Sequence, residues 1–274
     1  MTPGRGWTLA RPPANSKVRT AAGGYDPVTR LRGEGLGGVT GPDVLVQIHI
    51  PKCAGTSVAA WLRHAAETGL LNGFGAFYPE FVFDDDRLWQ AGLSDPRLSA
   101  VSAHNIRRFP REVRGRHMRY FTILRRPRAH FLSMVRYVIQ ERIKYGVPPE
   151  IGNSSREIAE LLLADPKNAY FRNNVQTNHL ALYPWCDATG GRLIAERFPY
   201  WAIGDQAAYE RERLDVAKDV LRSFMAAGTV ERLHETLEVV RRRSAAHWLH
   251  LLPAADVPVV NVTQVPMDDI SWLD

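Results

Sequence analysis

The feature that most constrains the fold is an uninterrupted apolar segment that ends at a proline and leads into a small-residue loop. Residues 44–50 read VLVQIHI, a β-branched run typical of a strand buried on both faces of a sheet. Pro51 cannot extend the hydrogen-bond ladder, so we expect the strand to stop there. Residues 57–68 then show helical spacing that ends near Gly69. The sequence thus predicts a buried strand, a tight loop and a covering helix.

The order of strand then helix recurs along the chain, and helices dominate its second half. Residues 98–103 and 120–124 are expected to form two further short buried strands, and a helix is expected after Pro127. Alternating strands and helices favour a doubly wound α/β fold, in which helices cover both faces of a parallel sheet. Helical periodicity predicts further helices over residues 155–163, 170–182, 206–226 and 229–243.

The first 42 residues differ in composition from the rest of the chain. They are rich in Gly, Pro, Ser, Thr and Arg, without strand or helix periodicity, and such segments bury too little apolar surface to become ordered. We therefore expect a disordered tail over residues 1–42. Residues 43–274 are long enough for one domain with a well-buried core.

Charge and cysteine content restrict the partners of the chain. A formal net charge of +6 favours anionic partners. Cys53 and Cys186 are the two cysteines, without the spacing of a zinc site or a disulfide framework. No run approaches the roughly 20 apolar residues of a membrane span. We expect a cytoplasmic protein that uses no metal and binds neither membrane nor nucleic acid; the sequence does not specify an oligomeric state.

The loop after the first strand has the residue types of an anion site. Backbone amides at a helix start attract anions, and Gly55 would let the main chain approach one closely. Thr56 and Ser57 add hydroxyl donors, and Lys52 would stabilise negative charge on a departing oxygen. An ordinary strand–helix turn with a solvated lysine fits the spacing equally well. The lysine precedes the glycine, unlike the Walker A pattern G-x-x-x-x-G-K-[ST], which disfavours a kinase or ATPase.

The loop PKCAGTS at residues 51–57 and the segment LRRPRAHFLS at residues 124–133 together resemble the carbohydrate sulfotransferases, among them the heparan sulfate 2-O- and 6-O-enzymes. Residues 51–57, PKCAGTS, resemble the P-K-T-G-G-T-S loop of that family. Residues 124–133, LRRPRAHFLS, are similar to its L-R-D-P-x-x-R-F-L-S segment, although Arg126 replaces the aspartate and His130 the second arginine. Weaker similarities follow in the family's order, at residues 173–177 (N-N-x-Q-T), 228–232 (G-x-T-E-R) and 260–263 (L-N-V-S).

The resemblance implies a P-loop-like sulfotransferase fold that uses 3'-phosphoadenosine 5'-phosphosulfate (PAPS) as the sulfuryl donor. Arg125 is expected at the carboxyl end of a strand and Ser133 on the next helix, converging on one anion. By the resemblance, these two residues hold the 3'-phosphate. The residues that it places on the 5'-phosphosulfate are Lys52, Gly55, Thr56 and Ser57.

His104 is the candidate general base. It follows the apolar segment 98–103, so we expect it at the carboxyl edge of the sheet, where ligands of such sheets bind. An imidazole with a pKa of about 6.5 can accept a hydroxyl proton at neutral pH. Ser102-Ala103-His104 also resembles the family's S-G-H segment, which carries the catalytic histidine. A structural histidine is the alternative, and His49 is interpreted as a hydrogen-bonded core residue.

The sequence therefore predicts a sulfotransferase that acts on a hydroxyl of a glycan or small molecule. The alternatives are a nucleotide or small-molecule kinase of related fold and a non-catalytic polyanion-binding protein. Two segments stay open: the arginine-rich residues 107–119 fit an acidic acceptor or a solvated loop, and the aromatic residues 74–78 fit an acceptor platform or core packing.

Overall fold

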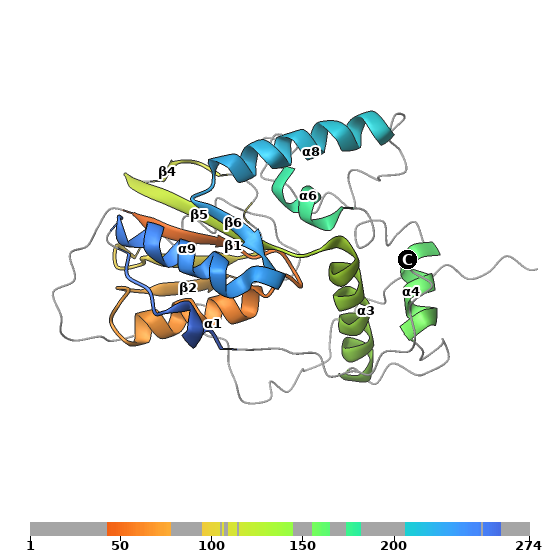
Figure 1. The fold of residues 1–274 in the computed structure, drawn as a ribbon, viewed down its shortest axis with the longest axis horizontal. Coiled ribbons are helices and arrows are strands. Elements are labelled where there is room, and N and C mark those ends of the chain that lie inside the picture. The colour runs from red at the N-terminus through yellow and green to blue at the C-terminus, as the bar shows by residue number, and fades with distance from the viewer. Residues whose placement is uncertain are drawn as a thin grey trace, which may run out of the picture.

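The computed structural model describes most of the chain from Asp43 to Pro258 (Figure 1). The predicted tail over residues 1–42 and the segment at residues 260–263 lie outside the described residues. The described ranges are 43–77, 95–104, 106, 109–113, 115–144, 155–164, 174–181, 206–247 and 249–258.

A sheet of parallel strands forms the centre of the molecule. The strand order is β2-β3-β1-β5-β6, and the short strand β4 pairs antiparallel with the beginning of β5. The chain starts in the middle, moves to the β2 edge and returns through β3, and then crosses β1 to reach β5. In sheets of this kind ligands bind beyond the carboxyl ends of the strands, close to the point where the strand order reverses. The strands are β1 (Val44–Ile48), β2 (Phe74–Phe77), β3 (Ala100–Ala103), β4 (Glu112–Val113), β5 (Arg116–Leu124) and β6 (Ala226–Thr229).

Helices cover both faces of the sheet, as alternate residues of β1 show. Leu45 packs into a core shared with the helices α1 and α9, whereas Val46 packs into a second core shared with α6 and α8 (Figure 1). The predicted α/β class with a parallel sheet is confirmed. None of the helices in the described ranges is long and apolar enough to cross a membrane. The four helices are α1 (Gly55–Glu67), α6 (Val175–Ala181), α8 (Gln206–Ser223) and α9 (Leu233–Ala245).

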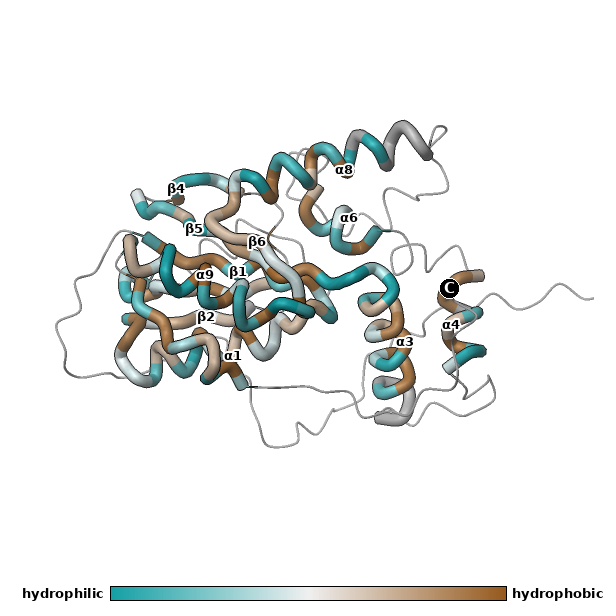
Figure 2. Tube along the Cα trace, in the orientation of Figure 1, coloured by the Kyte–Doolittle hydropathy of each residue, from teal (hydrophilic) through white to brown (hydrophobic). Residues whose placement is uncertain are grey.

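Two further helices extend beyond the carboxyl edge of the sheet. α3 (Pro127–Lys144) follows β5 directly and runs beside α4 (Ser155–Ala164), as Figure 1 shows. Hydrophobic and hydrophilic residues alternate along α3 (Figure 2), and its apolar residues Val135 and Ile139 form a small separate core with Ile158 of α4. At the start of α3, His130 hydrogen-bonds to the carbonyl of Pro51 in the loop that follows β1.

Three strands of the structure, β2, β4 and β6, were not predicted from the sequence. The helix predicted over residues 206–226 was wrong at its end, because α8 stops at Ser223 and Ala226 opens β6; the helix predicted from Thr229 begins after that strand. The small residues of β6 carry no strand pattern, and contact with α9 selects them: a Cβ at Gly228 would lie 2.0 Å from Thr236 Oγ1. β2 and β4 were not predicted, and Phe74 of β2 belongs to the core.

Candidate active site

The loop after β1 has a strained backbone. Lys52 and Ala54 adopt φ angles of 63° and 58°, in the left-handed region that non-glycine residues rarely enter. Each such residue costs about 1–2 kcal/mol, and strain of this kind concentrates at functional sites. In the P-K-T-G-G-T-S pattern a glycine stands at the position of Ala54, and glycine adopts this conformation freely. A glycine at position 54 would therefore adopt this backbone shape without strain.

The amino end of α1 offers an anion site. The first turn contains Gly55, Thr56 and Ser57, without an acidic residue and without a side-chain cap from Ala54. The first N–H groups of a helix have no intrahelical acceptor, and the helix dipole favours negative charge beside them. Thr56 is half-buried and Ser57 buried, so their hydroxyl groups lie at the junction of loop and helix. The predicted phosphosulfate residues thus share one short segment.

Arg125 lies at the same edge, directly after β5. β1 and β5 are adjacent parallel strands, and Arg125 Nη1 donates a hydrogen bond to the Lys52 carbonyl oxygen at 3.2 Å. Arg125 Nε is buried and has no hydrogen-bond partner within the described part of the chain. The two motif segments, 73 residues apart at these positions, therefore meet as predicted.

Gln176, which the sequence analysis did not select, joins three segments at this edge. Its Oε1 accepts from the Arg125 backbone N–H at 2.8 Å, and its Nε2 donates to the Arg125 carbonyl at 2.7 Å. Cys53 Sγ donates to the same Oε1 at 3.7 Å, and burial raises the pKa of Cys53 to about 12 against the opposing charge of Arg125. The available signal was the N-N-x-Q-T similarity, which does not reveal that the glutamine binds backbone groups of another motif.

His130 fastens α3 to the loop. Its side chain is buried, and its Nε2–H donates to the Pro51 carbonyl oxygen at 2.9 Å. Burial lowers the pKa of His130; the hydrogen bond to Pro51 opposes this shift, and the nearby charges of Arg125 and Lys52 reinforce it. The His130 ring, at the position of the second arginine in the L-R-D-P-x-x-R pattern, is therefore uncharged at neutral pH. It links α3 to the loop by a hydrogen bond and brings no positive charge to the site.

Ser133 lies on the same face of α3 as two residues that contact the loop. His130 precedes it by three positions and Tyr137 follows it by four, a spacing that aligns side chains along a helix. Lys52 Nζ lies 4.7 Å from the ring centroid of Tyr137. The described residues show no direct contact between the half-buried Ser133 and Arg125. The structure thus places both predicted 3'-phosphate residues at one end of the sheet without joining them.

His104 follows β3 directly and reaches the carboxyl edge as predicted. Its Nδ1 lies 2.7 Å from the His49 carbonyl oxygen. A carbonyl oxygen can only accept, so Nδ1 carries a hydrogen, and in the neutral ring Nε2 then carries the lone pair. This is the tautomer that a general base at Nε2 requires. His49 is buried beside it, as expected of a core residue.

Arg126 interacts with the start of the segment after β6. Its side chain is exposed, and its backbone N–H donates to Glu231 Oε1 at 3.1 Å. Desolvation opposes ionisation of Glu231, but hydrogen bonds from its own backbone and from Arg126 outweigh that effect and lower its pKa. The G-x-T-E-R similarity therefore marks a carboxylate that anchors the tip of β5.

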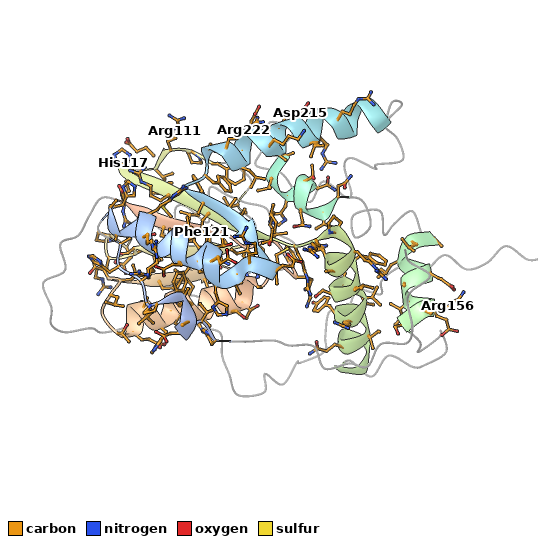
Figure 3. The ribbon with its side chains drawn as sticks, in the orientation of Figure 1. Arg111, His117, Phe121, Arg156, Asp215 and Arg222 are labelled. Carbon is orange, nitrogen blue, oxygen red and sulfur yellow. The ribbon has the colours of Figure 1, made fainter. Side chains whose placement is uncertain are left out.

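The described part of the arginine-rich run, residues 109–113 and 115–119, lies at the opposite end of β5, where Figure 3 shows Arg111 and His117. Arg116 donates to the Leu98 carbonyl oxygen, and Arg119 Nε donates to the buried Asp43 at 2.9 Å. These two arginines have structural partners, which neither a solvated loop nor an acceptor site predicts.

Comparisons with known proteins do not identify a family for the chain. No protein-family model matches the chain, and no curated protein matches it significantly. Within the described ranges, no group of three or more His, Cys, Asp or Glu side chains is placed to hold a metal ion.

Proposed function

We propose that the chain is a sulfotransferase that moves a sulfuryl group from PAPS to an acceptor hydroxyl. The observation that carries the proposal is the 3.2 Å hydrogen bond between Arg125 and the Lys52 carbonyl, which joins the two motif segments at neighbouring strand ends. PAPS is anionic at both its 3'- and 5'-positions, so two adjacent anion sites suit it. The strand order and the strained loop support a P-loop-like sulfotransferase fold.

The residues at this edge fit such a donor. The first turn of α1 and Lys52 would hold the 5'-phosphosulfate, with Gly55, Thr56 and Ser57 as its contacts. Arg125 and Ser133 would hold the 3'-phosphate. A buried charged donor without a partner costs more than the 1–3 kcal/mol of a neutral group. A phosphate oxygen would supply the acceptor that Arg125 Nε lacks among the described residues, provided that the groups covering this buried atom move on binding.

The roles of the residues in the transfer follow from their chemistry. His104 Nε2 would take the proton of the acceptor hydroxyl, whose oxygen forms the new bond to sulfur on the side opposite the leaving group. The bond from sulfur to the bridging oxygen breaks, and adenosine 3',5'-bisphosphate leaves. Lys52 would stabilise the charge on that oxygen, which grows in the transition state. The proposal gives no role to a metal, and the acceptor is a glycan or small molecule met in the cytoplasm.

A direct assay measures release of adenosine 3',5'-bisphosphate from PAPS with a panel of sugar and phenol acceptors. Wild-type protein should turn over, and His104→Ala should lose about 100-fold or more of the rate because the base is removed. His64→Ala is the matched control, since His64 is exposed on α1 and pairs with Glu67. Equal rates in wild type and His104→Ala would contradict the mechanism. Magnesium-dependent ATP turnover, or polyanion binding without turnover, would favour the kinase or the binding protein.

A further inference from the structure

The imidazole ring of His49 lies against the candidate base. The ring centroids of His49 and His104 are 4.0 Å apart with the planes tilted by 39°. The backbone of His49 is fixed to the same neighbouring segment: its N–H donates to the Ala103 carbonyl at 3.0 Å, and its carbonyl accepts from His104 Nδ1. The ring and the backbone carbonyl of His49 therefore both contact the His104 imidazole.

Gly55 leaves the space that the His49 ring fills. A Cβ at Gly55 would lie 1.8 Å from His49 Cδ2 and 2.0 Å from its Nε2, far inside any real contact. The φ angle of Gly55 is not in the left-handed region, so its backbone conformation does not require glycine. Gln47 Nε2 donates to the Gly55 carbonyl at 3.3 Å and fixes this residue from the strand side. The imidazole accounts for the glycine more directly than close approach of an anion.

We propose that His49 is a positioning residue: its ring, set between Gly55 and His104, couples the start of α1 to the orientation of the base. A displacement of the phosphosulfate loop would then move His104, so that the base is aligned only when the loop has its binding shape. Desolvation, followed by the charges of His104 and Lys52, lowers the pKa of His49 well below its ordinary value. The ring is therefore neutral and does not repel a proton that arrives on His104.

The steric part of the proposal is tested by unfolding, without reference to activity. Gly55→Ala and His49→Ala are each expected to lower the urea midpoint, the first by overlap and the second by leaving a cavity. In the double variant the added methyl group enters that cavity, so the midpoint should be no lower than that of His49→Ala alone. Additive losses would show that Gly55 is needed for another reason and would overturn the coupling.

The positioning part is tested on His104 itself. Nitrogen NMR should show the Nδ1–H tautomer of His104 in wild type, because the His49 carbonyl accepts from Nδ1. His49→Ala keeps this carbonyl but removes the ring packing, so His104 should turn away from the carbonyl and show a mixture of tautomers, and His49→Phe, whose ring keeps the packing, should restore the Nδ1–H form. An unchanged tautomer in His49→Ala would overturn the proposal even if the chain transfers no sulfuryl group.

The kinetic part rests on the proposed function. His49→Ala should lower kcat on the order of 100-fold, the effect of a misplaced catalytic group, while KM for PAPS changes less than about threefold. His49→Phe should keep most of the rate. Val240→Ala, a buried change in α9, is the control for lost stability. A loss of kcat no larger than that of Val240→Ala would contradict positioning, whereas failure of the proposed function would appear as no turnover in wild type.

Discussion

The two ends of β5 both carry arginine, yet their guanidinium groups have different surroundings. At the amino end, Arg116 is bonded to the Leu98 carbonyl and Arg119 to Asp43. At the carboxyl end, the Arg125 side chain donates to the Lys52 carbonyl in the loop after β1, and its Nε has no hydrogen-bond partner within the described chain. The partner of an arginine, more than the number of arginines, distinguishes a structural charge from a binding one.

Distance separates the two ends as well. β5 has nine residues, and a parallel strand rises about 3.3 Å per residue, so its first and last residues lie about 26 Å apart. A nucleotide-sized ligand at one end does not reach the other. Variants at the two ends should therefore have separate effects: on ligand and rate at the carboxyl end, and on stability at the amino end.

The largest effect is expected for Lys52→Ala. Removal of a charge that stabilises the leaving oxygen should lower the rate of sulfuryl transfer by about 100- to 1,000-fold, with a much smaller change in affinity for the bisphosphate product. Steady-state kinetics with PAPS measures the loss. Lys218→Ala on the exposed side of α8 is the matched control and should leave the rate unchanged. A fully active Lys52→Ala variant would contradict the proposal that sulfuryl transfer takes place at the carboxyl edge of the sheet.

The second prediction compares an alanine substitution of one arginine at each end of β5. Arg125→Ala should weaken adenosine 3',5'-bisphosphate binding about 10- to 100-fold, since hydrogen bonds to charged groups contribute about 1.5–3 kcal/mol. Arg119→Ala should keep the affinity and lose stability, because the buried Asp43 retains only His247 as a described ion-pair partner. Calorimetry and urea unfolding of both variants separate these outcomes. If Arg119→Ala lost affinity and Arg125→Ala did not, the contrast between the two ends would be wrong.

The sequence predicted those features of the carboxyl end that depend on short stretches of neighbouring residues. The apolar run before Pro51 predicted β1, and the positions of Arg125 and His104 followed because each comes directly after a predicted strand. Helical and strand periods cannot identify β6, whose small residues are selected by α9 across the sheet. Gln176 was missed for a similar reason, since its partners are backbone groups 51 positions away.

A smaller effect concerns pH and the neutral histidines of the carboxyl edge. Burial holds the pKa of His130 below its ordinary value of 6.5, so the folded chain binds fewer protons than the unfolded chain below that pH. Stability should therefore fall as pH falls from about 6.5 towards the lower folded pKa. His130→Gln keeps a donor for Pro51, and its stability relative to wild type should rise as pH decreases from 8 to 5. Urea unfolding measures it; an unchanged difference would mean that His130 titrates normally. His64→Gln, exposed on α1, is the control.

The smallest effect is a gain in stability from Ala54→Gly. Relief of the left-handed strain at φ 58° exceeds the entropy that glycine adds to the unfolded chain, which leaves about 0.5 kcal/mol of stabilisation. Ala60→Gly, in the middle of α1, should instead lose about 1 kcal/mol. Urea unfolding compares the two. Equal losses in both variants would show that the loop is not strained at Ala54.

The central claim is that the carboxyl ends of β1 and β5 form one site for a doubly phosphorylated adenosine. Titration calorimetry of wild-type protein with adenosine 3',5'-bisphosphate, and separately with ATP and magnesium, tests it most directly. We expect dissociation constants in the micromolar range for the bisphosphate and much weaker binding of ATP. Tight, magnesium-dependent ATP binding without affinity for the bisphosphate would contradict the account.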